Sequence, residues 1–123
     1  SPAKGFMKGF IDLIFQYDGS IYLVDWKSNF LGSSIENYHA DALKAAMIDR
    51  MYILQYHIYV LALHQYLKLR LPGYDYGRHF GGVYYLFLRG VSPEWGLDYG
   101  IYRDRPSPEL IEMLCARLIG PAK

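Results

Sequence analysis

A short turn between two apolar segments is the feature that most constrains the fold of this chain. Residues 9–16 and residues 21–27 are both suited to β-strands, and Asp18-Gly19 lies between them. This dipeptide is a strong signal for a hairpin, because a type I′ turn needs positive φ at both central positions. A turn centred there pairs residues whose numbers sum to 37, since 18 and 19 sum to 37. A four-residue loop would give the same register, whereas a three-residue loop would shift it by one.

This register places three charged side chains on one face of the predicted hairpin. Asp12 lies directly opposite Asp25, and Lys27 lies two residues further along the same face. Carboxylates on opposed residues, with Cβ atoms about 5 Å apart, repel by roughly 3 kcal/mol at an effective dielectric near 20. They are therefore expected to bind a divalent cation such as Mg²⁺, which prefers oxygen ligands. The alternative is a structural salt bridge to Lys27, which leaves one of the two carboxylates uncompensated.

A metal at such a pair favours the hydrolysis of phosphate esters. The ion lowers the pKa of bound water and neutralises charge on the phosphate. Lys27, beside the carboxylates, is suited to orient the attacking water or to stabilise the transition state. We therefore expect Asp12, Asp25 and Lys27 to be catalytic residues.

The long central segment is predicted to be helical. Residues 35–71 contain neither glycine nor proline, which is too long for one ordinary globular helix. We expect two helices, roughly 35–47 and 50–70, with a bend or break near Ile48–Asp49. The first would start at a capping box of Ser33 and Glu36. The second is apolar nearly all round, which predicts deep packing.

The remaining elements complete an α/β fold. We expect a third strand at 81–88, a short edge strand at 100–103 and a C-terminal helix at about 108–119. A strand followed by a long helical segment and another strand predicts a parallel crossover. The predicted fold is a mixed central β-sheet flanked by helices, and strands that are apolar on both faces predict a layer on each side.

Composition excludes several classes of function. The 123 residues form one domain or part of one, and 13 basic against 12 acidic residues give no overall basic footprint for nucleic acid. The single cysteine, Cys115, excludes an internal disulfide and an iron–sulfur cluster held by this chain, and it fits a reducing compartment. No apolar run is long enough for a membrane span, and no signal peptide is evident. These features predict a cytoplasmic location.

Several motifs resemble a known family. Gly9-x-x-Asp12 followed by Asp25-x-Lys27 resembles the PD-(D/E)xK nuclease superfamily. The strings KGFIDLIF, VDWKSNFLG, LQYHIYVLALHQYL and HFGGVYYLFLRG are similar to the RecB-type C-terminal nuclease domain of exodeoxyribonuclease V beta subunits. The resemblance covers residues from about 8 to 106. It implies that residues 1–123 are the C-terminal part of one such domain, a restriction-endonuclease-like core without its upstream helix and first strand.

The resemblance also implies roles for individual residues. Asp12, Asp25 and the backbone carbonyl of Trp26 would be ligands of Mg²⁺, or of Mn²⁺ in its place. Gln55 and Tyr59, four residues apart on one helix face, would bind substrate; without the resemblance, ordinary packing is the more common role for such a pair. The family also uses an acidic residue and a histidine from an upstream segment, and residues 1–8 contain neither.

The expected function is that of an Mg²⁺-dependent DNA nuclease of the exodeoxyribonuclease V type, acting in double-strand-break repair and recombination. The implied partners are DNA and the other subunits of a bacterial helicase–nuclease complex, with no membrane. One alternative is another exonuclease of the superfamily. A second is a non-catalytic interaction module, against which the intact set of Asp12, Asp25 and Lys27 argues.

Other polar residues carry weaker signals. The four histidines are predicted to be packed or solvated rather than metal ligands, and Cys115 to be a small core residue. Three arginines near predicted strand and loop ends either contact phosphates or only increase solubility: Arg89, Arg103 and Arg105.

Overall fold

The computed structural model describes residues 11–120 and contains one four-stranded mixed sheet in the order β1-β2-β3-β4. Strands β1 and β2 pair antiparallel, β2 and β3 pair parallel, and β3 and β4 pair antiparallel. The strands are β1 (Leu13–Tyr17), β2 (Ser20–Lys27), β3 (Phe80–Phe87) and β4 (Ile101–Asp104). The predicted mixed sheet flanked by helices is confirmed, and so is the parallel crossover between the hairpin and the third strand.

The hairpin has the predicted register. Tyr17 pairs with Ser20 and Leu13 pairs with Val24, so the numbers in each pair sum to 37. Asp18 and Gly19 have φ angles of 49° and 79°, as a type I′ turn requires. The predicted start of the first strand was wrong within the described residues, because β1 begins at Leu13, after Ile11 and Asp12; Gly9 lies outside the described residues.

The crossover between β2 and β3 contains a short 3₁₀ turn and two helices. These are η1 (Ile35–Tyr38), α2 (Ala40–Asp49) and α3 (Tyr52–Arg70). The predicted break between two helices is confirmed, but it lies at Arg50 and Met51, where Met51 adopts a positive φ of 59°.

The predicted start of the first helix was wrong. The capping box joins Ser34 to Asn37 instead of Ser33 to Glu36, and it closes only η1. Extended backbone at His39, which forms a β-bridge with Tyr99, then interrupts the helix before α2 begins.

The C-terminal half follows the prediction within one residue at most ends. A short helix that the sequence did not predict, α4 (Tyr76–His79), precedes β3, and a 3₁₀ turn, η2 (Leu88–Gly90), follows it. Asp75 caps α4 by accepting a hydrogen bond from the backbone of Arg78. The last helix is α5 (Pro108–Leu118), which Ser107 caps in the same way.

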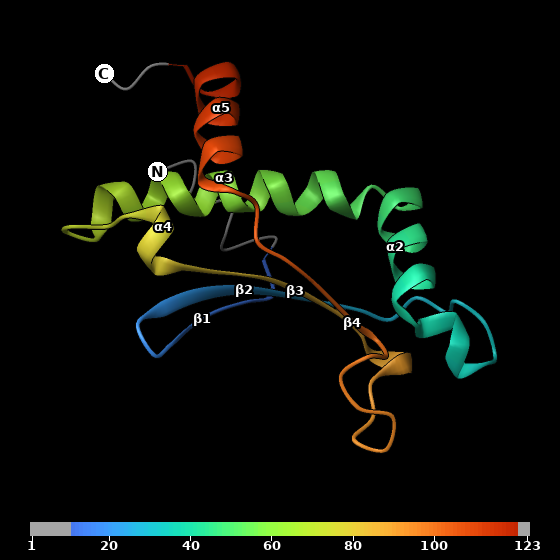
Figure 1. Cartoon of the computed structure of the whole chain (residues 1–123). Helices are drawn as coiled ribbons and strands as arrows, with labels where there is room; N and C mark the ends of the chain where they lie inside the picture. The colour runs from blue at the N-terminus through green and yellow to red at the C-terminus, as the bar shows by residue number, and fades with distance from the viewer. Residues whose placement is uncertain (1–10, 121–123) are drawn as a thin grey trace.

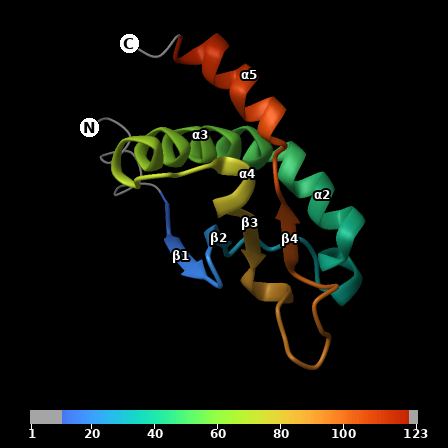
Figure 2. The same cartoon turned by 60° about the vertical axis from the view of Figure 1, so that its left-hand side comes forward.

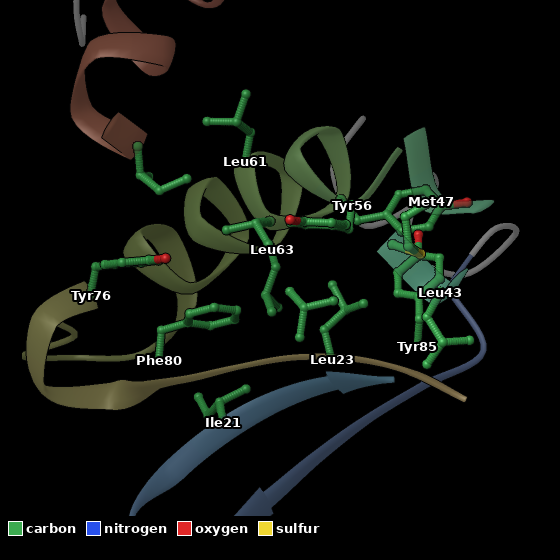
Figure 3. Close-up of a cluster of buried hydrophobic side chains, with 14 of the residues drawn as sticks. Ile21, Leu23, Leu43, Met47, Tyr56, Leu61, Leu63, Tyr76, Phe80 and Tyr85 are labelled. Atoms are coloured by element: carbon green, nitrogen blue, oxygen red, sulfur yellow. The ribbon is translucent and has the colours of Figure 1, made fainter. Parts of the chain in front are cut away.

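The core lies between the sheet and α3, which crosses one face of it (Figure 1). Leu23 and Phe80 of the sheet face Tyr56 and Leu63 of α3, whereas Leu61 lies on the side of α3 toward α5 (Figure 3). Burial of each large apolar side chain contributes about 1.5–3 kcal/mol. Cys115 of α5 is buried, as predicted for a small core residue.

The prediction that the second helix is deeply packed on all sides was only partly correct. Leu54 and Ile58 of α3 are 53% and 40% exposed, so within residues 11–120 part of the α3 surface is left uncovered. Among the described residues, no helix is both long enough and apolar enough to span a membrane.

The two faces of the sheet differ. Helices α3, α4 and α5 lie on one side of it (Figures 1 and 2). The other face carries a row of aromatic rings in which Phe15 stacks on Tyr22, with Tyr84 next to Tyr22. Within residues 11–120, the predicted layer on each side is therefore seen on the α3 side only.

Candidate active site

The hairpin brings the two predicted acidic residues together at the beginning of β1. Leu13 pairs with Val24. In the same register, Asp12, the residue before Leu13, lies opposite Asp25, the residue after Val24. The Asp12 carboxylate accepts a hydrogen bond from the backbone N–H of Trp26 at 3.0 Å. This bond fixes Asp12 beside β2 at the point where backbone pairing between the strands has ended.

Asp25 is the most deeply buried charged group in this cluster. The residue is only 3% exposed, and its carboxylate lies 3.3 Å from the Lys27 ammonium. Burial, with a hydrogen bond to the Asp12 carboxyl as the second cause, raises the pKa of Asp25 to about 6 against the opposing effect of Lys27. The structure therefore contains the salt bridge, yet Lys27 does not offset the cost of placing Asp25 near a second acid.

Two tyrosine rings enclose the Lys27 ammonium. It lies 4.3 Å from the ring centroid of Tyr52 and 5.5 Å from that of Tyr85. Tyr52 is the first residue of α3, and Tyr85 is the partner of Asp25 in the parallel register of β2 and β3. Since the faces of aromatic rings attract cations, the rings and Asp25 together fix the position of the ammonium.

Gln55 and Tyr59 reach the same cluster from α3. The Tyr85 hydroxyl donates a hydrogen bond of 2.5 Å to the side-chain oxygen of Gln55. Tyr59 is 4% exposed; burial raises its pKa, the negative charges of Asp25 and Asp12 raise it further, and a hydrogen bond with Gln55 lowers it. The structure thus brings the predicted substrate-binding pair to the carboxylates.

Tyr52 and Tyr85 were not predicted as residues of the site. Tyr52 carried a usable signal, since it lies three residues before Gln55 and seven before Tyr59, on the same helix face. Tyr85 carried no such signal, because its position beside Asp25 depends on the register between two strands far apart in sequence.

The donor atoms of this cluster suit a hard divalent cation. Two carboxylates that repel each other offer the oxygen ligands that Mg²⁺ prefers, with its other positions left to water and phosphate oxygens. A residue in an antiparallel pair directs its N–H and C=O to the same neighbour. Because the Trp26 N–H donates to Asp12, the Trp26 carbonyl also points to the side of β2 on which Asp12 lies. Within residues 11–120, no three His, Cys, Asp or Glu side chains gather as a metal site.

The histidines lie apart from the carboxylates and have local partners. The ring of His39 packs on Tyr99, His57 is hydrogen-bonded to the Ile53 carbonyl, and His79 is bonded to Asp75. His64 is 4% exposed, and its ring nitrogens make no hydrogen bond within the described part of the chain; Glu112 lies 3.6 Å away. Burial lowers the pKa of His64, and the charge of Lys68 lowers it as well.

The three arginines differ in environment. Arg105 donates to the backbone carbonyls of Phe80 and Gly77, which ties β3 to the chain after β4. Arg103 lies over the ring of Tyr84 on the sheet face opposite α3. Of the three, Arg89 is the one that contacts the residue after Lys27, since its Nε donates a hydrogen bond of 2.8 Å to the carbonyl of Ser28.

Comparison with known proteins gives a consistent set of relatives, although no family model matches the chain. The chain is 53% identical over 111 residues to the RecBCD enzyme subunit RecB of Haemophilus influenzae and 51% identical over 111 residues to that of Escherichia coli. Each match covers 90% of this chain. A RecB subunit of Mycobacterium tuberculosis is 42% identical over 91 residues, 73% of this chain. The chain spans only about 9% of the length of the first two relatives.

Proposed function

Over the region that it covers, the chain belongs with the RecB subunits of RecBCD enzymes, and on this premise we propose that it forms part of a divalent-metal-dependent DNA nuclease domain. The observation that carries the proposal is the pair of facing carboxylates, one of them buried, beside an enclosed lysine. Burying Asp25 next to Asp12 does not help the chain to fold, because the arrangement raises the pKa of Asp25 to about 6 and so penalises its ionised form.

In the proposed mechanism, this chain holds the metal and positions the groups around it. Asp12, Asp25 and the Trp26 carbonyl would hold Mg²⁺ or Mn²⁺. When bound, the ion would activate water and neutralise charge on the scissile phosphate. Lys27 would donate hydrogen bonds to the attacking water or to the phosphate oxygens, from a position fixed by Asp25 and Tyr52.

Gln55 and Tyr59 would align the substrate. The bond from Tyr85 fixes the oxygen of Gln55, so the amide group is held in one orientation. The Tyr59 hydroxyl lies in the field of the two carboxylates, where a phosphate oxygen bound to the metal would also lie. These contacts would hold the phosphodiester in line for hydrolysis.

The wider assignment extends the same proposal. Residues 1–123 would be the C-terminal part of a single PD-(D/E)xK domain in a longer polypeptide, of the exodeoxyribonuclease V type. That polypeptide would act on DNA in bacterial double-strand-break repair and recombination, in the cytoplasm and together with partner subunits, as the name RecBCD of its relatives suggests.

The direct test is metal binding by the 123-residue chain, measured as Mn²⁺ titrated by calorimetry. We expect weak binding that Asp12→Ala and Asp25→Ala each abolish, because two carboxylates and one carbonyl make an incomplete ligand set. Asp18→Asn is the matched control, since Asp18 lies in the turn at the other end of the hairpin. Micromolar binding that survives Asp12→Ala would refute the assignment of this site.

The second test is cleavage of DNA by the longer parent polypeptide. Asp25→Ala should abolish cleavage while the protein stays folded, because removing one of two repelling carboxylates does not weaken the sheet. An Asp25→Ala variant that unfolds, but whose folded fraction cleaves at the normal rate, would show that Asp25 serves only the salt bridge to Lys27.

A further inference from the structure

The loop after β2 and the turn after β3 meet next to the candidate active site. Strands β2 and β3 are parallel, so their carboxyl ends lie at one edge of the sheet, where ligands bind in α/β folds. Lys27 ends β2 and is followed by residues 28–31, while Phe87 ends β3 and is followed by η2, which contains Arg89. Both segments therefore border the proposed metal site.

The loop after β2 is held at three points. The Ser28 carbonyl accepts a bond from Arg89, and the Leu31 N–H donates to the Tyr38 hydroxyl at 3.0 Å. Between them, the Asn29 side chain exchanges hydrogen bonds of 3.1 and 3.3 Å with the hydroxyl of Tyr52, whose ring covers Lys27. The loop is thus tied to the residues that surround the lysine.

Phe30 is nevertheless 64% exposed in this fixed loop. A single exposed apolar residue is ordinary in itself. Here, however, the Arg89 guanidinium lies 5.9 Å from the centroid of the ring, and its bond to Ser28 uses only Nε. Within residues 11–120, the terminal nitrogens of Arg89 make no hydrogen bond or ion pair. An aromatic face and a guanidinium with unused donors are therefore presented together.

We propose that Phe30 and Arg89 form a subsite for one nucleotide of a single-stranded nucleic acid, with its base stacked on Phe30 and its phosphate bound by Arg89. Aromatic side chains beside positive charge are the usual platform for unpaired strands, because every base has a face that can stack. A base in a duplex is already stacked on its neighbours, so Phe30 selects a single strand. The proposal rests on the proposed nuclease function and assigns to Phe30 and Arg89 a contact with the strand outside the metal site.

The opposite face of the sheet offers a matched control. Arg103 lies 5.7 Å from the ring centroid of Tyr84, which is the same kind of contact as that between Arg89 and Phe30. That pair lies on the face of the sheet turned away from α3 and Lys27. Changes there test whether any exposed arginine and aromatic ring would bind the strand.

The test measures binding of a labelled oligothymidine, and of a labelled duplex, to the 123-residue chain by fluorescence anisotropy in EDTA. Phe30→Ala should weaken binding of the single strand by about 5- to 150-fold, and Phe30→Trp should restore it. Arg89→Gln should reduce the slope of log K against log salt by about 0.7, the value expected for one phosphate contact on a single strand. Arg103→Gln and Tyr84→Leu should leave both quantities unchanged.

Equal single-strand binding by the original chain and Phe30→Ala would overturn the proposal, and so would an equal loss on the duplex. Arg89→Gln could also lower affinity by displacing the loop. In that case Arg89→Lys, which keeps the charge, would lose affinity too, and the salt slope would stay unchanged. This outcome would count against a phosphate contact. These measurements are independent of the nuclease assignment, which fails instead if Asp25→Ala leaves cleavage and Mn²⁺ binding intact.

Discussion

Asp25→Asn should stabilise the metal-free chain, because Asp25 is a buried acid whose ionised form is penalised. Burial and the neighbouring Asp12 raise its pKa from 3.8 to about 6. Asparagine has nearly the same shape and carries no charge at any pH. The substitution therefore makes permanent the neutral form that the folded chain prefers.

The size of the effect follows from proton linkage. A rise in pKa from 3.8 to about 6, at about 1.4 kcal/mol for each tenfold change in proton affinity, corresponds to about 3 kcal/mol. Between these two pKa values the folded chain binds more protons than the unfolded chain, so the free energy of unfolding falls as pH rises through that window. Asp25→Asn should thus raise the free energy of unfolding by up to about 3 kcal/mol above pH 6, and the gain should vanish below pH 3.8.

Urea unfolding in EDTA at a series of pH values measures this difference. Asp18→Asn is the control, because Asp18 is exposed in a turn position that asparagine also tolerates, and its effect should stay within about 0.5 kcal/mol. Destabilisation by Asp25→Asn above pH 6 would contradict this prediction, because it would mean that the ion pair with Lys27 outweighs the burial penalty. A gain that is the same at every pH would also refute it, since it would not arise from ionisation.

The residues around the carboxylates and the buried His64 can be tested by single substitutions. Tyr59→Phe should reduce DNA cleavage by the longer parent polypeptide with little change in melting temperature, because only a hydroxyl is lost; cleavage at the original level would assign Tyr59 to packing. Tyr85→Phe removes the bond to Gln55 and should lower kcat by about 5- to 10-fold, the equivalent of about 1–1.5 kcal/mol, whereas a change in KM alone would contradict a positioning role. His64 is held neutral by burial, so the unfolded chain binds more protons and the free energy of unfolding should fall as pH drops below 6.5. Urea titrations of His64→Phe should show a flatter profile there, and an unchanged profile would mean that another group titrates.

Features that depend on residues close together in the chain could be predicted before the fold was known. A two-residue Asp-Gly turn permits one register, and that register alone places Asp12 opposite Asp25. The break between the long helices and the parallel crossover were likewise predictable, because they follow from helix length and chain connectivity. The start of α2 was not, because a β-bridge between His39 and the distant Tyr99 competes with the local capping signal.

The surroundings of the carboxylates depend on contacts between residues that are far apart in the sequence. Tyr85 lies beside Asp25 because β3 pairs with β2 in one particular parallel register, which no local turn specifies. The packing of α3 on the sheet then sets Tyr52 over Lys27 and Gln55 against Tyr85. Contacts of this kind join residues that are 25 to 60 positions apart, and they are selected by the burial of the whole α3 face rather than by any short pattern. The charged groups of the candidate site could therefore be found from the sequence, whereas the rings and hydrogen bonds that hold them became visible only in the fold.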